Sequence, residues 1–394
     1  MQYRVALALM LAVTSLSAAD KPLKVFILAG QSNMQGHAKI ETFDSLADDP
    51  KTAPLLKEMR GPDGKPKVCD KVWITSIGCQ GNAYSDLKEV TGKLTAGFGA
   101  PGGKIGPEFT FGITMEKLLG EPILIIKTSW GGRSLHTDFR SPSAGPFVWS
   151  DAELAKMKTR GDDIEKKNAE KIKATGEYYR QMIAHVNQVT ADIKRVVPDY
   201  DPKQGYELAG FVWFQGFNDV IDSGVYPNRM QPGGYDLHAE WLGHLIRDVR
   251  KDLKAPKMPV VIGVIGIGGF KEDKKAPHMH FRQAQVAPSL LPEFKDNVFA
   301  VPTAQFWDDE LEALQEKMGK INAKVDQTAK KDPAMTPKEK EAARKKAQEE
   351  GFTPEELKRL KAGVSNGGYH YLGAAKILAP IGKAFAEALV RVKP

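Results

Sequence analysis

The sequence of 394 residues contains only two cysteines, and no long hydrophobic run follows its first 20 residues. Two cysteines exclude a disulfide-dense scaffold, and no Cys/His spacing typical of a structural zinc site is present. A membrane-spanning helix needs about 20 apolar residues, and no later stretch approaches that length. The sequence also lacks internal repeats and a glycine-rich phosphate-binding motif. Its composition, 42% hydrophobic and 27% charged, excludes a disordered or collagen-like chain.

The formal charge of +7 could indicate a polyanionic partner. Residues 311–361, however, hold 13 Lys or Arg, 10 Asp or Glu and a single aromatic residue, Phe352. Thr336 and Thr353, each followed by proline, are typical of helix starts. We therefore predict a solvated helical insertion here. A nucleic-acid partner is not expected, because aromatic residues are not interleaved with the basic ones.

The first 19 residues are typical of a secretory signal peptide. Arg4 supplies a positive start, residues 5–16 are apolar, and residues 17–19 are the small residues that a signal peptidase accepts. We expect cleavage near Ala19, a secreted or periplasmic mature chain, and no membrane contact after cleavage. The alternative is an uncleaved anchor, for which the apolar run is short.

Export would also allow a disulfide between the two cysteines, Cys69 and Cys79. The residues between them, 70–78, could form a strand or one arm of a hairpin. Spacing alone does not decide between a disulfide and two free thiols. Both alternatives therefore stay open.

Five short apolar runs bounded by Gly or Pro predict the strands of a sheet. Runs that are continuously apolar, rather than alternating, are typical of parallel strands buried on both faces. Helical patterns lie between them, which favours an α/β fold with right-handed crossovers. We predict an α/β domain with a central, mainly five-stranded parallel sheet, formed by residues 20–394 with the insertion at 311–361. The runs are residues 24–29, 122–127, 210–214, 259–264 and 298–302, and the helical patterns are residues 109–119, 152–197, 235–253 and 372–392.

Chemically useful residues follow three of these runs, at the sheet edge where α/β proteins bind ligands. The first run leads into Gly-Gln-Ser-Asn-Met at residues 30–34, where Ser32 is either a nucleophile or a helix-capping serine. The second leads to Gly131 and Gly132, which would bring a backbone N–H close to an oxyanion or simply form a tight turn. The third leads to Gln215 and Asn218, which are neutral hydrogen-bond donors, although Asn218 could instead cap a helix.

A serine nucleophile needs a general base, and imidazole has a suitable pKa. Among the eight histidines, His370 lies in a glycine-rich turn directly before the last predicted helix. His278 and His280, which we expect in a polar loop after the fourth run, are the next candidates.

Together these segments resemble the signature blocks of the SGNH (GDSL-like) hydrolase superfamily. Within it they are most similar to the sialate O-acetylesterase domain, grouped with carbohydrate esterase family 6. The similarity runs from residue 24 to about residue 388 in the family's order. The matching segments are residues 30–34, Ile-Gly-Pro-Glu at 105–108, Trp-Gly-Gly at 130–132, Trp213, Gln215, Gly216 and Asp219 of the third block, and His370 followed by Tyr371.

The resemblance implies a three-layer α/β/α sandwich and an enzyme that hydrolyses acetyl esters of saccharides through an acetyl-serine intermediate, without a metal or organic cofactor. Ser32 would attack the ester and His370 would activate Ser32. The expected partner is an O-acetylated saccharide, while the sugar and the oligomeric state stay open. The resemblance implies that the Ser32 N–H, an N–H of Gly131 or Gly132 and the amide of Gln215 or Asn218 hold the oxyanion. It also suggests Gln31, Asn33 and Arg133 as substrate-binding residues.

The sequence departs from the family where the acid of a catalytic triad is usual. Gly367 stands three residues before His370, and Phe217 follows Gln-Gly, at positions that often carry Asp and Glu. Asp308, just past the fifth run, is our candidate acid, with Asp219 as a second. A backbone carbonyl, or no partner, would be the other solutions. The departures also keep open an inactive glycan-binding relative, and a lipase or thioesterase of the superfamily is a further alternative.

Overall fold

The computed structural model describes residues 21–80, 87–274, 276–332 and 334–391. The expected signal peptide, residues 1–19, lies outside the described residues. The described chain forms a seven-stranded sheet in the order β3-β2-β4-β1-β5-β6-β7. All neighbouring strands are parallel except β2 and β3. The strands are β1 (Leu23–Gly30), β2 (Val72–Ile77), β3 (Val90–Lys93), β4 (Ile123–Ser129), β5 (Tyr206–Phe214), β6 (Val260–Val264) and β7 (Val298–Pro302).

The predicted fold class is confirmed, and the sheet has two strands more than the five predicted. The five apolar runs became β1, β4, β5, β6 and β7. One of the two additional strands, β2, lies within residues 70–78, for which the sequence predicted a strand or a hairpin arm. The other, β3, is a four-residue edge strand with half-exposed side chains, so no continuous apolar run marks it.

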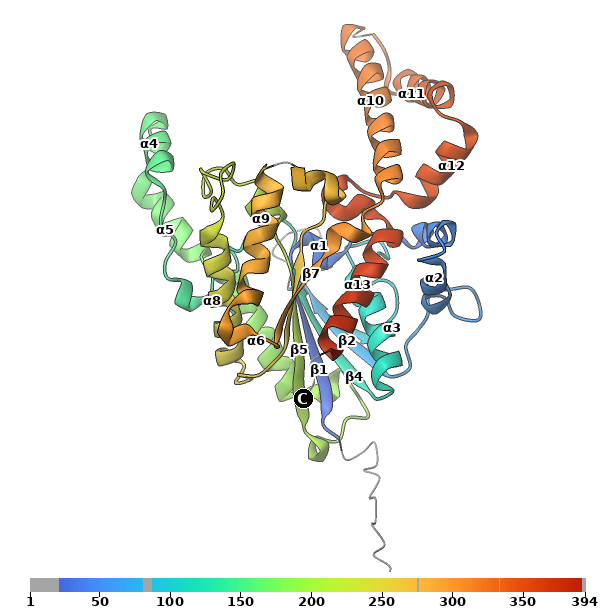
Figure 1. The fold of residues 1–394 in the computed structure, drawn as a ribbon. Helices are drawn as coiled ribbons and strands as arrows, with labels where there is room; N and C mark the ends of the chain where they lie inside the picture. Colours follow the sequence, from blue (N-terminus) through green and yellow to red (C-terminus); the bar gives the residue numbers. More distant parts are fainter. Residues whose placement is uncertain (1–20, 81–86, 275, 333, 392–394) are drawn as a thin grey trace, which may run out of the picture.

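Strand β1 lies in the middle of the sheet, between β4 and β5. Strands β2, β3 and β4 lie on one side of β1, and strands β5, β6 and β7 lie on the other. The crossovers therefore leave β1 in opposite directions, which creates a topological switch point beyond its carboxyl end. Figure 1 shows α1 (Ser32–Gln35) at this end of the strands.

Side chains of each central strand point alternately into two apolar cores, one on each face of the sheet. Along β1, Val25, Ile27 and Ala29 belong to the first core, which includes residues of α6, α8 and α9. Phe26 and Leu28 belong to the second, which includes residues of α3 and α13. Burial on both faces explains why the strands read as continuous apolar runs.

Helices flank the sheet on both faces (Figure 1). The four predicted helical segments correspond to α3, to α4 through α6, to α8 and to α13. His278 and His280 lie on α9 and not in the loop that we expected. The helices not yet given are α2 (Ala53–Met59), α3 (Pro107–Leu119), α4 (Asp151–Arg160), α5 (Ile164–Ala174), α6 (Glu177–Ala191), α7 (Phe217–Val220), α8 (Asp236–Asp252), α9 (Ala276–Val286) and α13 (Ala375–Val390).

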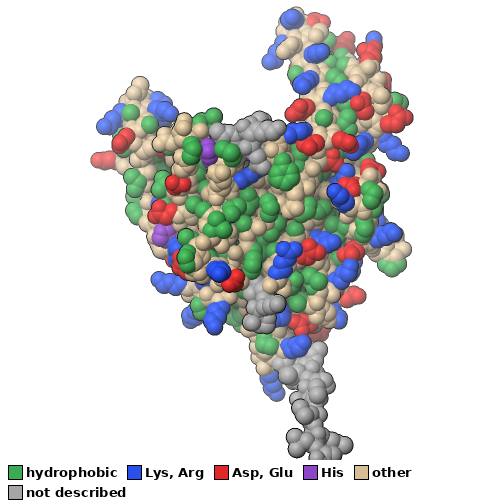
Figure 2. Space-filling model, viewed as in Figure 1, with side chains coloured by type: hydrophobic (Ala, Val, Ile, Leu, Met, Phe, Trp, Pro, Cys, Tyr) green, Lys and Arg blue, Asp and Glu red, His purple; other side chains and the backbone are tan. Residues whose placement is uncertain are grey.

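Two helical projections rise beyond the carboxyl ends of the strands, on opposite sides of the domain (Figure 1). One is α4 and α5. The other is α10 (Asp309–Lys331), α11 (Pro337–Gly351) and α12 (Pro354–Gly363), where the sequence predicts an insertion. Thr336 and Thr353 cap α11 and α12 through capping boxes, as the Thr-Pro pattern predicts. Figure 2 shows positive and negative side chains interspersed over this second projection.

The two cysteines are both buried and not bonded to each other. The Sγ atom of Cys79 lies 3.0 Å from the Oγ atom of Ser129 at the end of β4. The alternative of free thiols therefore holds in this structure. None of the helices in the described residues is long and apolar enough to cross a membrane.

Candidate active site

Three turns meet at the carboxyl end of β1. The register pairs Gly30 with Ser129 of β4 and with Phe214 of β5, so the three strands end at the same level. Trp130 N donates to Gly30 O at 3.2 Å, and Gln31 N donates to Phe214 O at 3.3 Å. This arrangement brings together the segments of Ser32, of the Gly131–Gly132 pair and of Asn218, as the resemblance implies.

Ser32 is the first residue of α1, directly after a sharp turn at Gly30. Gly30 has a φ of 157°, and a Cβ atom there would lie 2.1 Å from the carbonyl oxygen of Phe214. Only glycine therefore fits at this position. Ser32 is 6% exposed, and its Oγ lies 3.4 Å from Nε2 of Gln31.

The Gln31 side chain joins the turn after β1 to the turn after β5. Its Oε1 accepts from Gln215 Nε2 and from Gly216 N, both at 3.1 Å, and from Asn218 N at 3.3 Å. Its Nε2 donates to Asn218 Oδ1 at 2.9 Å. Gln31 is fully buried, so the structure gives it a positioning role instead of the substrate contact that the sequence suggested.

The two expected amide donors behave differently. Gln215 is buried, and its Nε2 contacts Gln31 Oε1, the Arg133 carbonyl at 3.0 Å and Asp219 Oδ2 at 2.5 Å. Its donor capacity is therefore used inside the protein, and the expectation that it donates to an oxyanion is not supported. Asn218 is only partly buried, and its Nδ2 has no partner among the described residues. Asn218 therefore keeps a free donor at the site.

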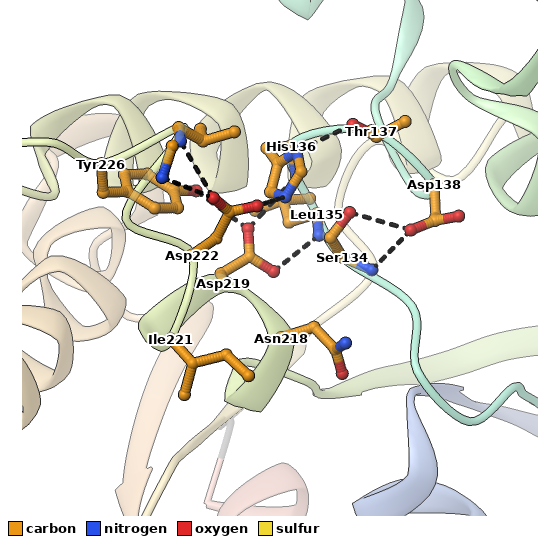
Figure 3. Close-up of polar contacts among 12 residues, drawn as sticks. Ser134, Leu135, His136, Thr137, Asp138, Asn218, Asp219, Ile221, Asp222 and Tyr226 are labelled. Carbon is orange, nitrogen blue, oxygen red and sulfur yellow. Dashed lines mark hydrogen bonds and ion pairs between the residues drawn. The ribbon is translucent and has the colours of Figure 1, made fainter. Parts of the chain in front are cut away.

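A buried carboxylate, Asp219, holds the loop after β4 against α7 (Figure 3). It accepts from Leu135 N at 2.8 Å, His136 N at 3.2 Å and the Tyr226 hydroxyl at 2.8 Å, in addition to Gln215. Burial would raise the pKa of Asp219, but the His238 ring 3.6 Å away, His136 and the backbone N–H of Leu135 hold it below its ordinary value. Asp219 thus orients the loop that follows the Gly131–Gly132 pair and is no partner of His370.

A buried ion pair between Lys127 and Glu108 contacts the end of α1. The ammonium group of Lys127 donates to Glu108 Oε2 at 2.6 Å, to the Gln35 carbonyl at 2.9 Å and to the Phe98 carbonyl at 2.9 Å. Lys127 and Glu108 are both fully buried. Because Gln35 ends α1, this ion pair helps to fix the short helix that begins at Ser32.

His370 lies in a 3₁₀ segment, η10 (Gly368–Gly373), that contacts α1. The two residues after it, Tyr371 and Leu372, have φ of 53° and 61°, so the chain turns back sharply there. The buried Tyr371 hydroxyl accepts from Gly266 N and lies 2.7 Å from the Thr303 hydroxyl. These bonds hold the turn that carries the imidazole ring.

The orientation of His370 is set by Asn366, four residues before it. The Oδ1 atom of Asn366 accepts from the backbone N–H of Gly367 at 2.7 Å and lies 3.2 Å from His370 Nδ1. A backbone N–H can only donate, so the atom that faces Gly367 N is the amide oxygen, which acts as an acceptor. The proton of neutral His370 is therefore on Nδ1, and Nε2 keeps the lone pair that a general base needs.

Burial and the positive charge of Lys104 lower the pKa of His370 to about 4. Among the described residues no carboxylate forms an ion pair with this ring. His370 is therefore neutral at pH 7 and ready to accept a proton. No hydrogen bond joins its ring to Ser32 within the described chain, as is common when a catalytic contact tightens only on substrate binding.

The candidate acid Asp308 has another role. Its Oδ1 caps α10 by accepting from Glu310 N and Leu311 N, and its Oδ2 pairs with Lys376 at 2.7 Å. Both oxygens are used by these contacts, and Asn366 occupies the Nδ1 side of His370. The prediction of Asp308 as the triad acid is therefore wrong.

Two further residues were expected at the substrate. Asn33 is 3% exposed, and its buried Oδ1 has no partner in the described part of the chain. The guanidinium group of Arg133 packs over the Tyr178 ring at 4.3 Å and lies 3.5 Å from Asp138.

Sequence reasoning missed Asn366, although it stands in the same block as His370. A side-chain amide near the histidine was the available signal.

Metal-binding geometry is absent from the described residues, where no group of three His, Cys, Asp or Glu side chains could hold an ion.

Residues 83–311 match the protein family described as carbohydrate esterase, sialic acid-specific acetylesterase. Ser32 and His370 lie outside the matched residues, so their roles rest on the geometry above.

No curated protein matches the chain by sequence. Similar solved structures include a protein of Arabidopsis thaliana, 19% identical over 72% of this chain and 86% of that one, with a TM-score of 0.39. A carbohydrate acetylesterase from Xanthomonas citri is 16% identical over 72% of this chain and 51% of that one, with a TM-score of 0.39. The protein NanS is 15% identical over 71% of this chain and 78% of that one, with a TM-score of 0.36.

Proposed function

The chain belongs to the carbohydrate esterase family of sialic acid-specific acetylesterases, and we propose that it is an exported serine esterase that removes O-acetyl groups from saccharides. We also place it with carbohydrate esterase family 6 as part of this proposal. The observation that carries the proposal is the His370 ring held by Asn366, with the Nε2 lone pair free, in a segment that contacts α1, the short helix that begins at Ser32.

The reaction follows from these groups as a two-step acyl transfer. Ser32 Oγ attacks the acetyl carbonyl carbon while His370 Nε2 takes the hydroxyl proton. The bond to the sugar oxygen then breaks, and this oxygen leaves with the proton from His370. Water, which gives a proton to His370, attacks the acetyl-serine. Acetate leaves, and Ser32 regains its proton.

Neutral donors would stabilise the negative oxygen in both steps. The backbone N–H groups of Ser32, Gly131 and Gly132 have no hydrogen-bond partner among the described residues. The Nδ2 group of Asn218 has none there either. Such preorganised donors typically supply the largest share of the rate enhancement in acyl transfer.

An amide in place of the triad acid orients the base but does not neutralise its charge. A carboxylate stabilises the imidazolium that forms in the transition state, and Asn366 has no charge to do so. We therefore propose an enzyme that works with lower kcat than a full triad. The same observation favours the second candidate, a glycan-binding protein of this fold without catalysis.

The test is acetate release by the purified chain from an O-acetylated sialic acid, an acetylated neutral oligosaccharide and 4-nitrophenyl acetate. Ser32→Ala should lower the rate at least about 1,000-fold. Ser289→Ala, in the turn after α9, is the matched control and should not change it. Equal rates for Ser32→Ala and the unmodified chain would overturn the proposal. Saccharide binding by calorimetry without acetate release would instead support the second candidate, and a preference for long-chain 4-nitrophenyl esters would indicate a lipase.

A further inference from the structure

A second histidine, His37, lies face to face with His370. The two rings are parallel to within 3°, and their centroids are 3.8 Å apart. His37 follows α1 and is five residues after Ser32, whereas His370 comes from the other end of the chain. The proposed reaction has so far assigned no role to His37.

The segments that carry the two rings are bound to each other. The Ser365 hydroxyl lies 3.3 Å from the His37 carbonyl and 2.6 Å from the Gly373 carbonyl. The backbone N–H of Lys39 donates to the same hydroxyl at 3.2 Å. The Ser365 hydroxyl therefore links the backbone beside His37 to the backbone beside His370, and the stacked arrangement does not depend on ring contact alone.

One amide also binds both rings. Asn366 accepts from His370 Nδ1 through Oδ1, and its Nδ2 lies 3.3 Å from His37 Nδ1. Because the Gly367 N–H fixes which atom is Oδ1, Nδ2 must be the donor to His37. His37 Nδ1 is then the acceptor, and the proton of the neutral His37 ring is on Nε2.

Stacking alone does not account for a histidine here. The Nε2 atom of His37 is buried and has no partner within the described residues, which is unfavourable for an N–H group. A phenylalanine ring would stack without leaving such a group unpaired. What phenylalanine cannot provide is the Nδ1 acceptor for Asn366.

We propose that His37 is a positioning residue for the acyl transfer: its Nδ1 anchors the Asn366 amide and its ring supports His370, so that the general base is held as the Nδ1–H tautomer. This inference rests on the proposed function only for its kinetic consequences. The tautomers themselves follow from the hydrogen bonds and exist whether or not the chain is an esterase.

The positive charges around the two rings disfavour the charged form of either ring. Burial, the His370 ring, Lys104 and Lys127 lower the pKa of His37 to about 3, and no carboxylate is among the groups that act on it. Tyr369 packs edge-on against His370, with centroids 4.4 Å apart. Both rings are therefore neutral in the resting protein, and His370 is the ring to which the proposed reaction assigns the Ser32 proton.

Two substitutions separate the two features of His37. His37→Phe keeps a stacked ring and removes the acceptor, whereas His37→Gln keeps an acceptor oxygen and removes the ring. We expect His37→Phe to lower kcat about tenfold with KM within about twofold, since an unanchored base loses part of the general-base contribution. His37→Gln keeps an acceptor for Asn366 and should therefore lower kcat by less than His37→Phe does. His244→Phe, on α8, is the matched control and should change neither constant.

A double-mutant cycle tests whether His37 acts through Asn366. In an Asn366→Ala background, His37→Phe should lower kcat by less than about twofold, because the group it anchors is already absent. Independent, multiplying losses would overturn the proposal. Circular dichroism and thermal unfolding check that each variant is folded. If His37→Phe is not folded, the imidazole spectra of the unmodified chain carry the test.

Imidazole ¹⁵N spectra of the full chain at pH 7 provide a test that needs no activity. We expect His370 as the Nδ1–H tautomer and His37 as the Nε2–H tautomer, assigned by the loss of each signal in His37→Gln and His370→Gln. A His370 signal of the Nε2–H tautomer would overturn the inference. Expected tautomers in a chain that releases no acetate would uphold the arrangement and overturn only the proposed function.

Discussion

Gln31 Nε2 donates to Asn218 Oδ1 at 2.9 Å, which joins the turn after β1 to α7 after β5. This bond uses the acceptor of the Asn218 amide and leaves its donor free. Asn218 lies beside the Asp219 cluster without joining it (Figure 3). The resemblance offered two amides as oxyanion donors, and this contact selects one of them.

We predict that Asn218→Ala lowers kcat about 100-fold with little change in KM, because an oxyanion donor acts mainly in the transition state. Acetate release from an acetylated saccharide measures both constants. Asn187→Ala, on the exposed face of α6, is the matched control. A loss below about threefold would remove Asn218 from the oxyanion site.

The pH dependence of the reaction should report His370. The pKa of His370 is lowered to about 4 by burial and by Lys104, and only the neutral ring can accept the proton of Ser32. The rate should therefore be constant near pH 6 and fall as the pH drops through about 4. In Lys104→Gln the positive charge is lost, the pKa of His370 rises, and the fall should begin at higher pH. Lys51→Gln, on the surface, should leave the profile unchanged, and an unchanged profile in Lys104→Gln would contradict the assignment.

A carboxylate in place of the Asn366 amide should shift the same profile further. In Asn366→Asp a negative charge would face Nδ1 of His370, which favours the charged ring and should raise its pKa by about one to two units. The acid limb of kcat/KM should move upward by that amount, and kcat at pH 7 should increase because the imidazolium is stabilised. Asn366→Ala removes the hydrogen bond without adding charge and should lower kcat at every pH. If Asn366→Asp and Asn366→Ala gave the same profile, Asn366 would not orient the base.

Much of the fold could be predicted because it rests on local patterns. The runs at β1, β4, β5, β6 and β7 are apolar on both faces, and that double burial is visible in the sequence. The starts of α11 and α12 follow from Thr-Pro and a glutamate three residues after the threonine. The edge strand β3 has neither signal, so it was missed.

The site was predictable only where a motif fixes the backbone. Ser32 follows from the turn at Gly30, and His370 from the block before the last helix. Asn366 was missed, although it stands in the same block as His370, because no turn motif marks the local turn that brings its Oδ1 to His370 Nδ1. Asp308 was misassigned because a carboxylate after a strand can also be a helix cap, and only the tertiary structure reveals which.

The buried pair of Lys127 and Glu108 should contribute to stability. Lys127→Met leaves the Glu108 carboxylate without its cation in the core, and we expect a loss of about 3–5 kcal/mol in the free energy of unfolding. Urea denaturation measures this value. Lys127→Met combined with Glu108→Leu removes both charges and should recover part of the loss. The surface pair of Lys117 and Glu58 is the control, since Lys117→Met should cost less than about 1 kcal/mol.

Asp219 should make the stability of the protein pH-dependent. Its pKa is held below the ordinary value of 3.8 in the folded protein. Its ionised form therefore contributes stability that is present above about pH 4 and is lost as the pH falls toward the folded-state pKa. Asp219→Asn replaces one acceptor oxygen with an NH₂ group, so donors from Leu135, His136, Tyr226 and Gln215 can no longer all be satisfied.

We expect Asp219→Asn to lower the free energy of unfolding by about 3–5 kcal/mol at pH 7, and this difference should shrink at pH 3, where the unmodified chain has itself begun to lose the contribution. Urea denaturation at the two pH values measures both differences. Asp222→Asn is the matched control. The side chain of Asp222 is 33% exposed and contacts His136 Nε2 at 3.2 Å, so solvent can replace its contacts and the loss should be smaller. Equal losses for the two variants, or a loss independent of pH for Asp219→Asn, would show that the buried carboxylate does not hold the loop after β4.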